Sequence, residues 1–279
     1  MPASGPRSFS FEVLPVNAKE TVRELMPFKP AWINVVSRGR ADLELCRDIQ
    51  DEFGVEVVAH ILCFDFDRAQ TEKALRRLHE YGVKSVFALQ GDGAGVAPRG
   101  EGFNHYAADL VAQIKRMGLD FRVGVAGYPE GHVRASSPES DIAHLKAKVD
   151  AGADYVITQM FFDNERFYDF EQRCRRAGIG VPIVPGLKVL SSAAQVKFVQ
   201  DNFHVEVPKE LSDIIGKGHE PAGAKWVEQQ VETLLPVYKN IHLFVLGDIL
   251  PLKKLITSVV KTHDKDHDVE CSCHKLQPK

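Results

Sequence analysis

The stretch SDIAHLKAKVDAGADYVITQ, residues 140–159, contains both kinds of segment from which most of this chain is built. Residues Ser140–Ala151 have the spacing of an amphipathic helix. A short turn with a glycine follows, and then Tyr155–Gln159 forms an apolar run with β-branched residues that is typical of a buried strand. A helix that leads directly into a buried strand predicts one unit of a parallel β/α structure.

The same alternation extends in both directions from this stretch. We expect eight strands, at Ser8–Leu14, Trp32–Val36, Glu56–Leu62, Ser85–Leu89, Arg122–Ala126, Tyr155–Gln159, Pro182–Val184 and His242–Val245. The helical patterns between them include Ala41–Glu52, Ala69–Tyr81, His105–Met117, Ser140–Ala151, Asn164–Ala177, Ala193–Asn202 and Gly223–Lys239. Two candidate helix N-caps stand out, one at Ser137 and one at Thr71.

Eight units in this length predict a single (βα)8 barrel of the TIM type, because a doubly wound sheet usually has five or six strands. Residues 1–262 are expected to form this barrel and residues 263–279 a charged, flexible C-terminal tail. The segment Pro208–Glu220 is an insertion before the last of these helical patterns. No Pro/Ser-rich linker divides the chain into two domains.

The composition is that of an ordinary globular protein. The 279 residues are 44% hydrophobic and 26% charged, with a formal net charge of −3. This balance gives no basic field that would favour nucleic acid, and no apolar run approaches the ~20 residues of a membrane span. We therefore expect a cytoplasmic protein with neither a nucleic-acid nor a membrane partner.

The cysteines fall into two groups by their position in the chain. Their odd number and scattered positions argue against a disulfide framework, and Cys46, Cys63 and Cys174 fit small buried apolar residues. The tail has a different character, because donor side chains crowd its sequence HDKDHDVECSCH. These donors are His263, His267, Cys271, Cys273 and His274. They could hold a soft divalent metal, but the charge density favours a disordered end, and no metal site is predicted.

Polar residues at the ends of the expected strands are the main signal of chemistry. Glu12 lies in the apolar run FSFEVLPV, residues 9–16, where a carboxylate is either turned to water or used as an acid. The other members of this set are His60, Asp92, Tyr128, His132 and Gln159. A (βα)8 barrel carries its reacting groups at the C-terminal ends of its strands, so we interpret the set as a functional site.

The glycine-rich loop GDGAGVAPRGEG, residues 91–102, gives only a weak nucleotide-binding signal. Its Gly91, Gly93 and Gly95 form G-x-G-x-G and lack the spacing that brings a helix N-terminus onto a pyrophosphate. We interpret the loop as a segment that carries Asp92 to the mouth of the barrel.

Several segments resemble, in order and spacing, those of methylenetetrahydrofolate reductases. They are FSFEVLP, AHILC, ALQGD, HYAADLV, VAGYPEGH, LKAKVDAGADYVITQMFFD, RCRRAGI and PIVPGL. The resemblance implies a (βα)8 barrel with FAD that takes a hydride from NADH or NADPH in a ping-pong reaction. It passes the hydride to 5,10-methylenetetrahydrofolate to give 5-methyltetrahydrofolate, in the one-carbon metabolism that serves methionine biosynthesis.

The resemblance also implies roles for individual residues. Glu12 would be the acid that helps open the five-membered ring of the folate, and Asp92 would lie beside the flavin and the pterin. Gln159 and Gln195 would join these two in contacting the folate. The residues implied to line FAD are His60, Gln90, Gly91, Asp92, Tyr106, Ala107, Tyr128, His132, Ala135, Asp141, His144 and Lys148.

The chain departs from this family pattern at several positions. Gln90 stands where an arginine usually precedes Gly-Asp, and Asp248 stands where an arginine that contacts the folate is often found. Two other functions stay open: a flavin-dependent barrel acting on another cyclic amine, and a non-catalytic subunit that binds folate or flavin. The sequence does not choose between NADH and NADPH, and it permits a homo-oligomer without requiring one.

Overall fold

The computed structural model describes residues 8–37, 42–91, 102–218, 221–245 and 247–259. Eight parallel strands close into a barrel in which each strand pairs with the next along the chain and β8 pairs with β1. The strands are β1 Ser8–Val13, β2 Ile33–Val35, β3 Val57–Leu62, β4 Ser85–Leu89, β5 Arg122–Gly127, β6 Tyr155–Met160, β7 Ile183–Leu187 and β8 Asn240–Val245. The predicted single (βα)8 barrel is therefore confirmed.

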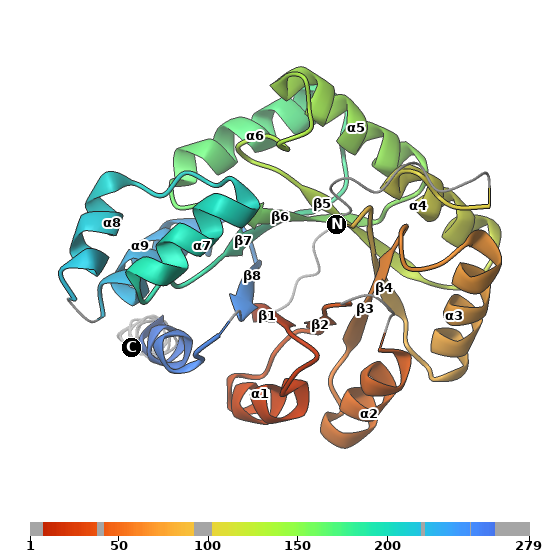
Figure 1. The fold of residues 1–279 in the computed structure, drawn as a ribbon, viewed down its shortest axis with the longest axis horizontal. Helices are drawn as coiled ribbons and strands as arrows, with labels where there is room; N and C mark the ends of the chain where they lie inside the picture. The colour runs from red at the N-terminus through yellow and green to blue at the C-terminus, as the bar shows by residue number, and fades with distance from the viewer. Residues whose placement is uncertain (1–7, 38–41, 92–101, 219–220, 246, 260–279) are drawn as a thin grey trace, which may run out of the picture.

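Helices surround this barrel on its outer side (Figure 1). They are α1 Ala18–Leu25, α2 Leu43–Phe53, α3 Arg68–Glu80, α4 Ala107–Arg116, α5 Pro138–Asp150, α6 Asn164–Arg176, α7 Ala193–Phe203, α8 Lys209–Gly216 and α9 Ala222–Leu234. A short 3-10 helix spans Met26–Phe28, and a further helix covers residues 250–259. None of the helices in the described ranges is long and apolar enough to cross a membrane.

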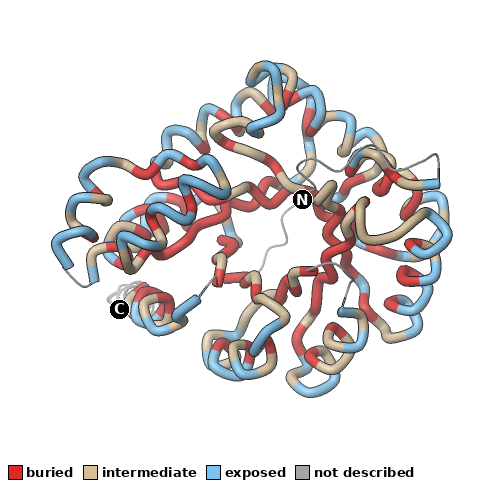
Figure 2. The backbone as a smooth tube through the Cα atoms, in the orientation of Figure 1, coloured by how far each residue is buried: buried red, intermediate tan, exposed pale blue. Residues whose placement is uncertain are grey.

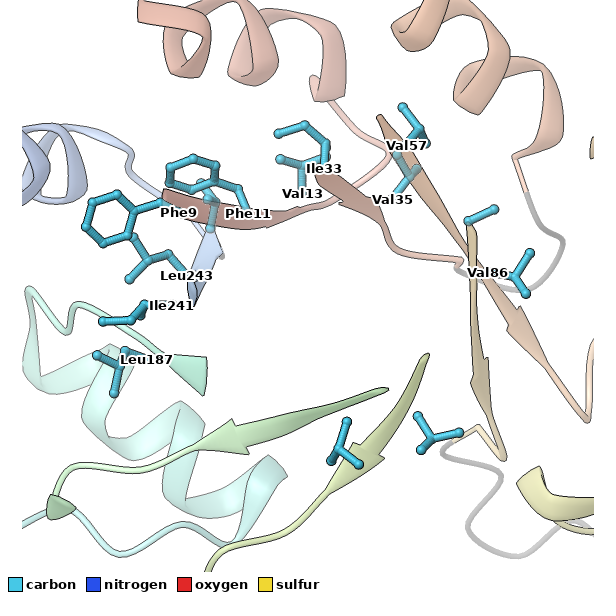
Figure 3. Close-up of a cluster of buried hydrophobic side chains, with 14 of the residues drawn as sticks. Phe9, Phe11, Val13, Ile33, Val35, Val57, Val86, Leu187, Ile241 and Leu243 are labelled. Carbon is cyan, nitrogen blue, oxygen red and sulfur yellow. The ribbon is translucent and has the colours of Figure 1, made fainter. Parts of the chain in front are cut away.

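The main hydrophobic core lies between the barrel and the helices. Side chains alternate along each strand, so Phe9, Phe11 and Val13 of β1 face outward while Ser10 and Glu12 face the interior. Figure 3 shows the outward side chains of neighbouring strands gathered into one apolar layer. In Figure 2 the strands are buried, and the helices are exposed on the side that faces away from them.

The three cysteines expected to be small apolar residues are buried in this core. Cys46, Cys63 and Cys174 are each at most 2% exposed and are not joined in disulfides. The predicted tail, residues 263–279, lies outside the described residues.

One of the two predicted helix caps is confirmed and the other is wrong. Ser137 caps α5, and its hydroxyl accepts a hydrogen bond from the backbone N–H of Ser140 at 3.1 Å. Thr71 is fully buried inside α3. That helix is capped by Asp67, whose carboxylate accepts from the N–H of Gln70 at 2.7 Å.

The predicted limits of two C-terminal elements are corrected. Strand β7, expected to end at Val184, continues to Leu187, because Gly186 and Leu187 pair with His242 and Leu243 of β8. The N–H of Gly186 also donates to the hydroxyl of Thr158 at 2.9 Å. The helix expected over Gly223–Lys239 ends at Leu234, since Pro236 has no backbone N–H with which to continue the helical hydrogen bonds.

Candidate active site at the carboxyl ends of the strands

The interior of the barrel has a polar side formed by β8, β1, β2 and β3. Its inward side chains are Ser10 and Glu12 of β1, Asn34 of β2, His60 of β3 and His242 of β8. All except Glu12 are at most 3% exposed. Because every strand is parallel, Glu12 near the end of β1 lies toward the rim where all the carboxyl ends meet.

Glu12 is a largely buried acid. Its side chain is only 15% exposed, and burial raises its pKa from 4.5 to about 7. The positive charge of Lys188 acts in the opposite direction and limits this rise. Glu12 can therefore hold a proton at neutral pH and can also release it, as a general acid must.

His60 lies beside Glu12 as a neutral group. Its Nε2 is 3.7 Å from Oε2 of Glu12, but burial lowers the pKa of the imidazole to about 3. The indole N–H of Trp32 donates to Oδ1 of Asn34 at 2.9 Å, so the amide nitrogen of Asn34 faces Nε2 of His60 at 3.1 Å. Nε2 accepts this hydrogen bond, and the ring proton is on Nδ1.

A second neutral histidine lies deeper in the barrel. The hydroxyl of Ser10 donates to Oδ1 of Asn240 at 2.9 Å and accepts from Nδ1 of His242 at the same distance. Burial and the neighbouring His60 together lower the pKa of His242 to about 3. Histidine therefore contributes hydrogen bonds rather than charge to this side of the barrel.

The loop between β5 and α5 holds three of the residues implied to line FAD. The rings of Tyr128 and His132 meet edge to face with centroids 4.6 Å apart. The N–H of His132 donates to Asp141 at 3.3 Å, and Nδ1 of His132 accepts from the N–H of Arg134 at 3.1 Å. Ala135 closes the turn by donating its N–H to the carbonyl of His132 at 2.8 Å.

Helix α5 carries three more of these residues. Burial raises the pKa of Asp141, although Lys148 opposes the change, and burial lowers the pKa of Lys148 to about 8. The ammonium group of Lys148 donates to the carbonyl of Ala126 at the end of β5 at 2.5 Å. His144 lies on the exposed side of the helix. Asp141 and Lys148 are thus joined to the β5 rim by hydrogen bonds, and His144 influences Asp141 through its charge.

The residues that follow β4 lie near the same rim. Gln90 donates to the carbonyl of His105 at 2.9 Å and accepts from the guanidinium of Arg134 at 3.0 Å, which links this segment to the loop after β5. Gly91 has a φ of +90°, and a Cβ there would lie 3.0 Å from Cδ2 of Leu62. Tyr106 is the exposed N-cap residue of α4, and Ala107 is the buried first residue of that helix.

The two glutamines implied to contact folate occur near two other strand ends. Oε1 of Gln159, on β6, accepts from the N–H of Met160 at 2.9 Å. Gln195 lies in the first turn of α7, where its Oε1 accepts from the N–H of Ser191 at 2.9 Å. Asp92, the second expected catalytic residue, lies outside the described residues.

Sequence reasoning missed three interior residues: Asn34, Lys188 and His242. Asn34 and His242 could have been found from the period-two pattern, since each is a polar residue among outward apolar neighbours. Lys188 lies four residues after Val184, where its strand was expected to end. It was therefore not recognised as a residue of the barrel interior.

Fold and site together define a class of protein: a (βα)8 barrel with a protonatable carboxyl group near the carboxyl ends of its strands, where enzymes of this fold carry their active sites. A solved Clostridium thermocellum protein, described as uncharacterized and binding two copies of 5-methyl-5,6,7,8-tetrahydrofolic acid, has a similar fold. Its TM-score is 0.62 at 12% identity, with 90% of this chain and 93% of that chain covered.

Sequence comparison identifies the family within this class. The family model of methylenetetrahydrofolate reductase matches residues 2–248. The chain is 35% identical to the 5,10-methylenetetrahydrofolate reductase of Salmonella typhimurium over 221 residues, covering 75% of this chain and 73% of that protein. It is 34% identical to a probable methylenetetrahydrofolate reductase (NADPH) of Caenorhabditis elegans, covering 80% of this chain and 35% of that protein. This chain belongs to the methylenetetrahydrofolate reductase family of oxidoreductases, as its motifs predicted.

Proposed function

We propose that this protein reduces 5,10-methylenetetrahydrofolate to 5-methyltetrahydrofolate with NADH or NADPH, through bound FAD and in a ping-pong sequence. Family membership supports the overall reaction. The observation that carries the chemical step is Glu12, a buried acid at the rim of the barrel with a pKa of about 7.

Glu12 is suited to one step of this reaction in particular. The methylene carbon accepts a hydride only after the five-membered ring opens, and the ring nitrogen leaves more readily when it receives a proton. A carboxyl group that is protonated near neutral pH supplies that proton. His60 cannot replace it, because its imidazole is neutral and its Nε2 already accepts from Asn34.

The residues at the β4 and β5 ends fit FAD in their chemistry. The paired rings of Tyr128 and His132 offer aromatic surface, and Lys148 carries positive charge below pH ~8, which suits a diphosphate. When bound there, FAD supplies hydride storage between the nicotinamide and folate halves of the reaction. The residues proposed to hold it are His60, Gln90, Gly91, Asp92, Tyr106, Ala107, Tyr128, His132, Ala135, Asp141, His144 and Lys148.

The amide side chains have a different proposed role. Gln159 and Gln195 each present a donor and an acceptor that can match the edge of a pterin. In the structure their Oε1 atoms accept backbone N–H groups, at Met160 and Ser191 respectively. Their amide N–H groups are then the parts that would contact folate, together with the carboxylate of Asp92.

Absorbance spectroscopy of the purified protein tests this function. We expect a flavin spectrum that bleaches anaerobically with NADH or NADPH and returns when 5,10-methylenetetrahydrofolate is added. A flavin that is reduced but is reoxidised only by another cyclic imine or iminium compound would indicate the rival oxidoreductase. Protein that neither carries nor rebinds flavin would indicate a non-catalytic subunit.

A further inference from the structure

Lys188 is a buried lysine for which the motifs and the reaction above provide no role. It lies one residue beyond the end of β7 and is only 4% exposed. Removing an ammonium group from water is costly unless an opposite charge or hydrogen bonds compensate for it. Its position therefore requires an explanation in terms of what it lies against.

The strand register places Lys188 on the level of Glu12. Gly186 and Leu187 of β7 pair with His242 and Leu243 of β8, so the next residue, Lys188, falls beside Phe244. Phe244 in turn pairs with Glu12 of β1. Lys188 also has the inward parity of Gly186, where a Cβ would lie only 2.8 Å from the ring of Phe244.

Lys188 and Glu12 also affect each other's pKa electrostatically across β8. Burial lowers the pKa of Lys188 to about 8, and Glu12 opposes that change. Lys188 likewise opposes the effect of burial on the pKa of Glu12. An ammonium group and a carboxyl group with pKa values of about 8 and about 7 thus lie on one level of the barrel and influence each other electrostatically.

Among the described residues, the two histidines near Glu12 are neutral. His60 approaches it from β3 and His242 lies on β8, and burial lowers the pKa of each to about 3. In the part of the chain that the structure describes, Lys188 is the only charged residue that shifts the pKa of Glu12. Asp92, expected at the same rim, is outside that part.

We propose that Lys188 is a positioning residue that stabilises the carboxylate of Glu12 formed during folate reduction. In that step the proton moves from Glu12 to the ring nitrogen, the carbon–nitrogen bond breaks and its electron pair remains on nitrogen. Negative charge appears on Glu12, and the ammonium group of Lys188 balances it. The inference rests on the proposed function for its role in catalysis, and on the fold alone for the pairing of Lys188 with Glu12.

The pairing is tested without any substrate by ¹³C NMR titration of the glutamate side chains, with Glu12→Gln to assign the Glu12 signal. We expect a midpoint near 7 in the wild-type protein, an upward shift of about one pH unit or more in Lys188→Met, and little change in Lys188→Arg. The matched control is Lys146→Met, which removes a lysine that pairs with Asp150 on α5. An unchanged Glu12 midpoint in Lys188→Met would overturn the proposal.

A reciprocal titration keeps the proposal testable if Lys188→Met does not fold. Because coupling between two sites is mutual, Glu12→Gln should lower the midpoint of a ¹³C-labelled Lys188 side chain below its wild-type value of about 8. A Lys188 midpoint that is the same with and without the Glu12 carboxylate contradicts the pairing.

The catalytic role is tested by the pH profile of the folate half-reaction in stopped-flow experiments. Lys188→Met should move the loss of rate at high pH upward by the same interval and lower the rate at the plateau, because Glu12 becomes a weaker acid. Flavin reduction by NAD(P)H should keep its wild-type rate. Equal slowing of both halves with an unshifted profile would indicate a merely structural lysine, whereas a wild-type protein without flavin reduction would refute the proposed function instead.

Discussion

The two sides of the barrel interior differ in how they fill the same kind of space. Strands β4, β5 and β6 meet through Phe87, Gly124 and Tyr155, with Ile157 extending an apolar cluster. The opposite side, formed by β8, β1, β2 and β3, is filled by hydrogen-bonded polar groups and by Glu12. Both sides are built from parallel strands of one closed barrel, so the contrast comes mainly from the side chains.

The two sides also differ in the free energy of burying their side chains. The apolar side gains stability from close packing of two aromatic rings over a glycine. The polar side buries the acid Glu12, and Lys188 is buried just after the neighbouring β7; their pKa values of about 7 and about 8 show that burial disfavours both charged forms. We expect substitution of Glu12 to change the chemistry, and substitutions that overfill the apolar side to change stability alone.

The largest effect is expected from Glu12→Gln. This change keeps the size of the side chain but removes the proton, so reoxidation of the flavin by 5,10-methylenetetrahydrofolate should slow by ~10²-fold or more. Flavin content and reduction by NAD(P)H should stay near wild type, because hydride transfer to the flavin needs no proton from this residue. Anaerobic stopped-flow absorbance measures the two halves separately.

Loss of both half-reactions to the same degree would contradict this prediction. That outcome would make Glu12 a structural residue of the polar side. The two sides would then differ in polarity but not in catalytic role.

On the apolar side, Gly124→Ala should lower stability by about 1–3 kcal/mol through overpacking. A Cβ at Gly124 would lie 2.4 Å from Cζ of Tyr155 and 2.6 Å from the ring of Phe87, so both rings would have to move. Urea unfolding measures the loss. Gly180→Ala is the matched control, since a Cβ there has no neighbour within 4 Å; equal effects of the two substitutions would show that the rings adapt freely.

The barrel could be predicted from the sequence because the alternation of strands and helices is repeated along the chain. Each of the eight expected strands is present in the structure, since runs of β-branched and apolar residues indicate buried strands wherever they recur. The predicted limits of elements are wrong where local signals compete with tertiary contacts. Pro185 and Gly186 suggest the end of a strand, yet pairing with β8 extends β7 to Leu187. Threonine is a common N-cap residue, but Thr71 is buried within α3 and does not cap it.

The candidate site could be predicted only in part. Glu12 was noticeable because it is an isolated charge in an apolar run, and a buried charge is rare without a purpose. Its partnership with Lys188 joins residues far apart in the chain and depends on the register of β7, β8 and β1. No local pattern contains that register.

The pH dependence of stability sharpens the contrast within the polar side. His60 and His242 have pKa values of about 3, against 6.5 when unfolded, so the unfolded chain takes up their protons first and stability falls as pH drops below ~6.5. Glu12 acts oppositely between pH 7 and 4.5, because its raised pKa lets the folded protein bind the proton first. The two histidines outweigh the single acid.

Replacing Glu12 should therefore steepen the loss of stability in acid. Between pH 6.5 and 4.5, Glu12→Gln removes the opposing proton and increases the slope by up to about 1.4 kcal/mol per pH unit. His242→Gln should make the slope shallower by a similar amount. Urea unfolding at a series of pH values gives both slopes, and parallel curves for the two variants would show that neither group has a shifted pKa.

The smallest effect is expected from removing one hydroxyl on the apolar side. The hydroxyl of Tyr155 is buried and has no hydrogen-bond partner among the described residues, so Tyr155→Phe should leave stability unchanged or raise it by less than about 1 kcal/mol. The aromatic ring stays in place, with the guanidinium of Arg122 5.4 Å from its centroid. Ser10→Ala removes a hydroxyl from the polar side and should cost about 1–3 kcal/mol, because His242 and Asn240 each lose a partner. If the two variants unfold at the same urea concentration, hydrogen bonding does not distinguish the two sides of the barrel; a clear gap between them would show that the polar side depends on the hydrogen bonds of Ser10.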